Sequence, residues 1–332
     1  MTELVAPGTG ASVPVAPAGP LGLRVSAIRW LAPTIREIEL SAPDGGPLPA
    51  PSAGAHIDLS LPGDLSRSYS LVNAPGDDRR YLVAVNRDAA SRGGSAHICE
   101  TMRVGDMLQV SAPLNTFPMA DADLSVFFAG GIGITPVLSM IRAAAARGRN
   151  WELHYAVRDR DSGAYLPELA ALAAATGGLV HLHEDKAAGG VMDIAPRVAA
   201  VPEGAHLYCC GPAPMIAAFL KATEGRPEAT LHVEHFSNDF EISDKSFTVV
   251  LRRKGMEVTV PAGKTIIDAL VEAGVRVNYS CREGVCGTCE TRVIDGVPDH
   301  KDNVLSDREK ASNKVIMICC SSAKSDRLVL DI

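Results

Sequence analysis

Four cysteines near the carboxyl end of the chain have a spacing that suits an iron–sulfur cluster. Cys281, Cys286 and Cys289 form the pattern C-x4-C-x2-C, and Cys319 follows in a later segment. This is the plant-type spacing of a [2Fe–2S] cluster, in which one tight loop supplies three thiolates and a distant segment supplies the fourth. Two glycines in the loop would allow the positive φ angles that such a cage requires. The sequence therefore predicts a cluster held by these four side chains.

Zinc binding and ordinary buried thiols are the competing interpretations. Zinc usually takes paired C-x2-C units, and the sequence has only one. The fourth ligand is ambiguous because Cys319 and Cys320 are adjacent. In a strand they would point to opposite faces, and Val315 and Met317 share a face with Cys319. This pattern favours Cys319 as the ligand.

A second chemical signal is a glycine-rich turn that follows the continuous apolar run Leu124–Ala129. Glycines allow the close backbone approach that a pyrophosphate needs, and a helix that begins there would present its N–H groups. We expect Thr135 to be the N-cap and Pro136 the first helical residue. A merely structural strand–helix turn is the alternative. The turn comprises Gly130, Gly131, Ile132, Gly133, Ile134, Thr135 and Pro136.

Composition narrows the possible functions. The chain has 332 residues, a net charge of −7 and 46% apolar residues. Its acidity disfavours nucleic acid as a partner, and no apolar run approaches the roughly 20 residues that span a bilayer. Residues 1–20 lack the basic residues of a signal peptide, so we expect a disordered tail and a cytoplasmic protein.

Three sequence patterns follow one another along the chain. Residues 21–121 contain short β-like segments between turn signals, which predicts an antiparallel β-barrel. Residues 122–234 alternate strand and helix, which predicts a parallel α/β domain. Residues 235–245 are polar and read as a linker. Residues 246–332 begin with a hairpin and a helix opened by a capping box at Thr265.

The cysteine loop and the order of these sequence patterns resemble those of the phthalate dioxygenase reductase family, which belongs to the ferredoxin reductase superfamily. The resemblance extends from about Leu21 to the end of the chain. It implies a flavin-binding β-barrel, a nicotinamide-binding α/β domain and a C-terminal β-grasp ferredoxin domain. Because the ferredoxin domain comes last, as in the FMN group, the resemblance implies FMN as the flavin.

The segment Arg67–Ser70 is similar to the R-x-Y-S flavin signature of the superfamily. The resemblance implies that Tyr69 packs on the flavin ring, that Ser70 lies near its N5 edge as a catalytic residue, and that Arg67 meets the phosphate. A planar guanidinium suits phosphate. We expect further cofactor contacts from the neighbouring strand residue, a glycine turn before a helix at residues 96–102, and the segment leaving the barrel. These are Ser68, Gly93, Gly94, Ser95 and Thr116.

For the nicotinamide, the glycine turn is similar to the G-G-x-G-[IL]-T-P segment of the superfamily. Cys210, Gly211 and Pro212 resemble its C-G-P segment, which implies a place for Cys210 beside the hydride-transfer locus. The family's E-x-F segment matches at Glu234–Phe236, so Phe236 is expected to shield the flavin face; the alternative is that it anchors the linker against the core. Arg158 is expected beside the adenosine ribose, and the family resemblance favours NADH.

Together these features predict an NADH-dependent oxidoreductase that passes electrons from NADH to FMN, then to [2Fe–2S], then to a partner protein. The resemblance implies a Rieske-type terminal oxygenase that acts on an aromatic or related small substrate. We also expect a monomer. The alternatives are a reductase for a di-iron or haem monooxygenase, or a ferredoxin-like carrier with a vestigial flavin site.

Overall fold

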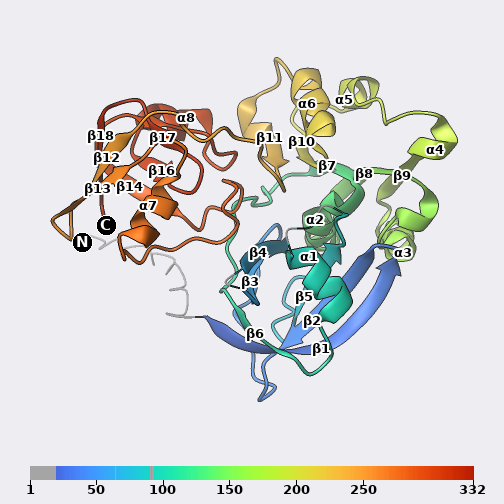
Figure 1. The fold of residues 1–332 in the computed structure, drawn as a ribbon. Helices are drawn as coiled ribbons and strands as arrows, with labels where there is room; N and C mark the ends of the chain where they lie inside the picture. Colours follow the sequence, from blue (N-terminus) through green and yellow to red (C-terminus); the bar gives the residue numbers. More distant parts are fainter. Residues whose placement is uncertain (1–19, 64, 90, 92) are drawn as a thin grey trace, which may run out of the picture.

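The computed structural model describes residues 20–63, 65–89, 91 and 93–332. The expected tail, apart from Pro20, therefore lies outside the described residues. Figure 1 shows three bodies in chain order, coloured blue to teal, green to yellow, and orange to red. Each is built around its own sheet. A barrel, a parallel α/β domain and a C-terminal domain with mixed strands match the expected architecture.

The first body is an antiparallel sheet in the order β4-β3-β6-β1-β2-β5. A bridge between Leu71 and Val83 joins the ends of this order and closes the sheet into a barrel. Its strands alternate buried and exposed residues because one face lines the core. They are β1 (Leu21–Ala32), β2 (Ile35–Ser41), β3 (His56–Leu61), β4 (Leu65–Ser70), β5 (Tyr81–Asn86) and β6 (Met107–Val110).

The second body is a fully parallel sheet in the order β11-β10-β7-β8-β9. Helices α2 and α3 pack on one face, and α5 and α6 pack on the other. The strands are β7 (Leu124–Gly130), β8 (Asn150–Val157), β9 (Leu179–Glu184), β10 (His206–Cys210) and β11 (Leu231–Glu234). The helices are α2 (Ile134–Ala146), α3 (Leu166–Thr176), α4 (Asp185–Ala188), α5 (Ala195–Ala200) and α6 (Ala213–Ala222).

The third body has the sheet order β13-β12-β18-β14-β16, in which β12 and β18 run parallel, and a small β15-β17 pair. Helix α7 (Ile266–Glu272) packs on this sheet, and the expected capping box at Thr265 and Asp268 is present. The other elements are β12 (Phe247–Leu251), β13 (Met256–Val260), β14 (Glu290–Asp295), β15 (Pro298–Asp299), α8 (Asp307–Ser312), β16 (Val315–Met317), β17 (Ser322–Ala323) and β18 (Arg327–Leu330).

Two expected helix starts are wrong. Helix α2 begins at Ile134 with Gly133 at the N-cap, so Thr135 and Pro136 lie inside its first turn. The Thr135 hydroxyl donates to the Ile132 carbonyl (3.0 Å), and Gly133 takes the N-cap position instead. The helix expected at 96–102 begins at Gly94, as α1 (Gly94–Ala96), and continues as a π-helical turn. Gly93 has a φ of 102°, which lets the chain enter the helix there.

The described connection between β11 and β12 contains neither helix nor strand. Among the described residues, no helix is long and apolar enough to cross a membrane.

Candidate functional site

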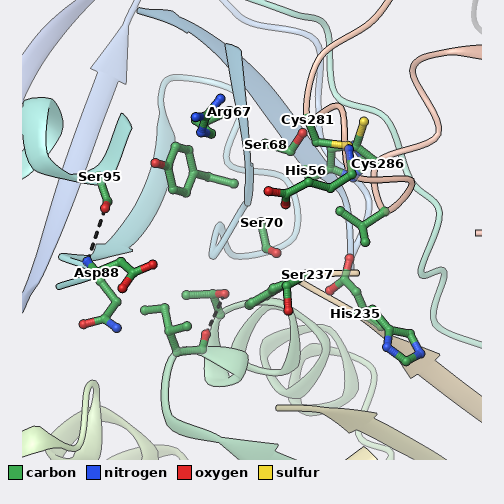
Figure 2. Close-up of a pocket in the computed structure, with 18 of the residues that line it drawn as sticks. His56, Arg67, Ser68, Ser70, Asp88, Ser95, His235, Ser237, Cys281 and Cys286 are labelled. Atoms are coloured by element: carbon green, nitrogen blue, oxygen red, sulfur yellow. Dashed lines mark hydrogen bonds between the residues drawn. The ribbon is translucent and has the colours of Figure 1, made fainter. Parts of the chain in front are cut away.

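A cavity of about 360 Å³ lies where the three bodies meet. Its wall includes Tyr69 from the barrel, Thr135 from the parallel domain and Cys286 from the cysteine loop. Figure 2 shows β4 residues, the segment after β11 and the cysteine loop turned toward this space. A volume of this size suits a bound cofactor. Residues far apart in the sequence are thus gathered around one space.

The pleat of β4 gives each residue of the flavin signature its direction. Successive side chains of a strand point to opposite faces. Figure 2 shows Arg67 on one side of the strand and Ser68 on the other, toward Cys281. Arg67, Ser68, Tyr69 and Ser70 all line the cavity. Burial raises the pKa of Tyr69, so its ring stays a neutral phenol.

The expected phosphate end of the cavity combines a cation with hydroxyls. Arg67, Ser91 and Ser95 line it, and the Ser95 hydroxyl donates to Ser91 (3.0 Å) and accepts from the Asp88 N–H (3.2 Å, dashed in Figure 2). Gly94 lies against Arg67, because a Cβ there would be 2.7 Å from the Arg67 Cγ. A guanidinium and hydroxyl donors suit a phosphate, so this wall fits the FMN phosphate. Gly93 and Gly94 support the wall without lining it.

The glycine turn after β7 interlocks with the turn after β10. A Cβ on Gly133 would be 2.1 Å from the Cys210 carbonyl oxygen, and one on Gly130 would be 2.6 Å from Pro212. Gly131 has a φ of 54° and no neighbour within 4 Å of its ideal Cβ. Glycine is therefore required here for close backbone approach and for the turn, which leaves room for a dinucleotide. Gly211 packs against the same turn.

Cys210 and Glu234 are neighbours at the end of the parallel sheet, paired in register between β10 and β11. Burial raises the pKa of the Cys210 thiol, and its side chain does not line the cavity. Glu234 does line the cavity, and its buried Oε2 has no hydrogen-bond partner. Burial raises the pKa of Glu234 to about 8. A neutral carboxyl group thus faces the space that the nicotinamide would share with the flavin.

The remaining expected nucleotide and flavin residues lie at different distances from the cavity. Phe236 lines it and is 38% exposed. Arg158 is exposed just after β8, at the same edge of the sheet as the glycine turn. Thr116 is away from the cavity wall, and its Cγ2 lies against Gly287 of the cysteine loop. Thr116 therefore belongs to the contact between two bodies.

The cysteine loop brings the four predicted ligand thiols together. Side-chain interactions link Cys281 to Cys286 and Cys319, and Cys319 to Cys289, and all four are buried. The backbone N–H of Glu283 donates to the Cys281 sulfur (3.3 Å), as expected around a thiolate cluster. This donor set fits [2Fe–2S].

The environment of Cys319 and Cys320 differs from the expected strand. Both lie in a turn that follows β16, so alternation along a strand does not separate them. Their contacts do: the Cys319 thiol interacts with Cys281 and Cys289 as well as with Cys320, whereas the Cys320 thiol lies beside Cys319, Ser321 and the Met317 carbonyl.

Several polar residues at the site carried no signal in the sequence. His56 and Asp58 lie on β3 directly opposite Ser70 and Ser68, so the pairing of two strands brings them in. Ser280 and Thr288 flank ligand cysteines and were absent from the expected site. Only the strand register could have revealed the first two.

Comparisons with known proteins agree with this geometry. Residues 249–324 match the model of the 2Fe-2S iron-sulfur cluster binding domain, and residues 127–221 match that of the oxidoreductase NAD-binding domain. The chain is 48% identical to tetrachlorobenzoquinone reductase of Sphingobium chlorophenolicum over 95% of its length and 99% of that protein. It is 38% identical to the phthalate 4,5-dioxygenase oxygenase reductase subunit of Pseudomonas putida, over 94% and 96%.

Two solved structures are similar. Phthalate dioxygenase reductase superposes with a TM-score of 0.71 at 37% identity, over 95% of this chain and 98% of that one. An intact type IV self-sufficient cytochrome P450 monooxygenase gives 0.85 at 41% identity, over 94% of this chain and 41% of that one.

The fold and the site define an NADH-dependent oxidoreductase that uses FMN and a [2Fe–2S] cluster. Within that class, the chain belongs to the phthalate dioxygenase reductase family.

Proposed function

We propose that this chain is the reductase component of a Rieske-type oxygenase system, whose partner acts on an aromatic or related small substrate. The main support is the single cavity whose wall combines Tyr69, Thr135 and Cys286. Relatives named as oxidoreductase or reductase subunits include the vanillate O-demethylase oxidoreductase of a Pseudomonas strain (43% identical) and the phthalate 4,5-dioxygenase oxygenase reductase subunit. Electrons from NADH would reach the partner through the flavin and the cluster.

In this proposal, the barrel residues bind and orient the flavin. Tyr69 packs against the ring, Arg67 binds the phosphate with Ser95, and Ser68 and Ser70 face the polar edge. When bound, the flavin supplies the exchange between two-electron and one-electron chemistry. Gly93 and Gly94 shape the phosphate wall, and Thr116 supports the contact between the barrel and the cysteine loop.

The parallel domain binds NADH and orients its nicotinamide. Arg158 lies near the ribose, and the backbone at Cys210 borders the reacting ring. Phe236 of the linker shields the flavin face until the nicotinamide arrives. The pyrophosphate meets the interlocked turns. Their residues are Gly130, Gly131, Gly133, Thr135, Pro136, Gly211 and Pro212.

Cys281, Cys286, Cys289 and Cys319 hold the cluster in this proposal. The domain limits are those expected from the sequence: 21–121, 122–234 and 246–332, with a linker at 235–245. We propose a monomer that works in the cytoplasm, where NADH is supplied and thiols remain reduced.

The first test is cofactor release. The purified protein is denatured and its supernatant is examined for flavin; we expect FMN in a ratio close to one per chain. Recovery of FAD, or of no flavin, would overturn the flavin assignment. The folded protein is then mixed with NADH and a purified Rieske oxygenase, and reduction of the oxygenase's Rieske centre is followed by its visible spectrum.

A haem monooxygenase is a second candidate partner. Its support is the similarity to the self-sufficient P450 chain, of which this chain covers 41%. The same assay with a cytochrome P450 in place of the Rieske oxygenase distinguishes the two. Faster reduction of the haem protein would favour this second function.

A further inference from the structure

The contact between the barrel and the cysteine loop contains an ordered set of polar side chains. Asp58 on β3 accepts a hydrogen bond at each carboxylate oxygen. Oδ1 accepts from the Ser68 hydroxyl (2.5 Å), and Oδ2 accepts from the Thr288 hydroxyl (2.9 Å). One carboxylate thus joins the strand that carries the flavin signature to the loop that carries the cluster ligands.

Asp58 is held firmly in this position. Its backbone N–H donates to the Ser111 hydroxyl (2.9 Å), and its carbonyl accepts from the Ser111 N–H (3.0 Å). Asp58 also lies opposite Ser68 in the antiparallel pair of β3 and β4, so the two side chains share a face. The carboxylate is therefore fixed by the barrel and not by the loop that it contacts.

Thr288 lies between the ligands Cys286 and Cys289, and its hydroxyl has only one proton to donate. The Thr288 Oγ1 is 3.4 Å from the Cys286 sulfur and 2.9 Å from Asp58. An ionised carboxylate can only accept, so the proton points to Asp58. As long as it does, Thr288 cannot donate to the Cys286 sulfur.

We propose that Asp58 is a positioning residue that keeps the proton of the Thr288 hydroxyl directed away from the Cys286 sulfur. In this way it keeps the cluster's reduction potential low. Hydrogen bonds to cluster sulfurs and the local net charge set the potential of such clusters. A low potential favours onward delivery of the electron to a partner over its retention on the cluster. The inference rests on the proposed assignment of Cys286 as a ligand.

The direct test is Asp58→Asn in the full, cofactor-loaded protein. A side-chain amide can donate to the Thr288 oxygen, which frees the hydroxyl to donate to the Cys286 sulfur. We expect the cluster's potential to rise, so that the sharing of an electron between flavin and cluster shifts about tenfold toward the cluster, or about 59 mV for a one-electron couple. The electron spin resonance spectrum of the reduced cluster should change as well.

Thr288→Val separates the hydrogen bond from the charge. In this background Asp58→Asn removes the same carboxylate but frees no hydroxyl, so we expect a shift below threefold. Ser66→Ala is the matched control, because it breaks another hydroxyl contact between the barrel and the loop, to Ser280 (2.7 Å), without touching Asp58 or Thr288. Its potential and spectrum should equal those of the unmodified protein.

The possible results distinguish the proposed effect of the hydrogen bond from an effect of charge alone. An unchanged potential in Asp58→Asn would overturn the inference, and so would an equal shift with and without the Thr288 hydroxyl, since charge alone would then account for it. Cluster content is measured in every variant from its visible absorbance. Failure of the ligand assignment is a separate result, because it would show as a cluster that survives Cys286→Ser.

Discussion

The barrel meets its two neighbours in different ways. Toward the parallel domain, its residues Ile35, Leu82 and Phe117 share one buried apolar cluster with Val137 and Ile141 of α2. Toward the C-terminal domain the contacts include hydrogen bonds of Ser66 and Asp58 and a methyl contact of Thr116, and the apolar cluster of that domain includes no described barrel residue. One boundary is a continuous core, and the other, the polar boundary, has hydrogen bonds but no apolar cluster that the described residues of the two bodies share.

This difference matches what each boundary must do. Hydride transfer requires reacting atoms held at near contact, which a shared core secures. A single electron crosses a gap without bond formation, so the second boundary requires only that the loop stay close. A polar boundary also leaves each body with a complete core of its own.

The largest expected effect is at the cluster boundary. Cys286→Ser should abolish the visible and spin resonance signals of the cluster, because a hydroxyl is a poor replacement for a thiolate ligand. Flavin binding and its reduction by NADH should remain, since the shared core is untouched. Cys99→Ser is the control: Cys99 lies on the barrel against the Val85 carbonyl, and its loss should leave the cluster intact. A normal cluster in Cys286→Ser would contradict the ligand set.

Next is the shared core itself. Met140 on α2 is fully buried, and its Cε is 2.8 Å from the position that a Cβ on Gly54 of the barrel would take. Met140→Ala should lower the free energy of unfolding by about 2–5 kcal/mol, measured in denaturant, because the truncated side chain leaves a void where the two bodies pack together. Met107→Ala, on a barrel residue that is 54% exposed, should change it by under about 0.5 kcal/mol. Equal effects would refute the shared core.

The comparison also separates what the sequence could reveal from what it could not. The short β-like segments predicted between turn signals in residues 21–121 include β3 (His56–Leu61) and β6 (Met107–Val110). The cysteine spacing predicted which thiols would meet. Both signals are local, and each is read from a few adjacent positions.

The contacts at the polar boundary had no comparable local signal in the sequence. Asp58 and Thr288 are 230 positions apart and touch only after β3 pairs with β4 and the loop folds onto that pair. Thr135 illustrates the same limit on a smaller scale: a good N-cap residue type lies inside α2, because the interlocked glycines start the helix earlier. Tertiary packing decided both positions.

Glu234, which lines the cavity at the end of β11, adds a dependence on pH. Burial raises its pKa to about 8 from 4.5, so the folded protein keeps the proton that the unfolded chain loses. Its protonation contributes on the order of 5 kcal/mol to the free energy of unfolding. This contribution is complete below about pH 4.5 and is lost as pH rises to about 8. Glu234→Gln should remove this loss, so the variant gains stability over the unmodified protein from pH 5 to pH 8. Parallel unfolding curves for both proteins across that range would contradict this.

The smallest expected effect tests the polar boundary. The hydroxyls of Ser66 and Ser280 are 2.7 Å apart across it, and such a hydrogen bond contributes about 1 kcal/mol. A double-mutant cycle of Ser66→Ala and Ser280→Ala should therefore give a coupling energy near that value, and flavin-to-cluster electron transfer should slow by less than tenfold in either variant. A coupling as large as the Met140→Ala effect would mean that this boundary is also a core, and the contrast between the two boundaries would fail. A small coupling with preserved transfer would mean that the loop is held by several weak contacts, any one of which can open without separating the domains.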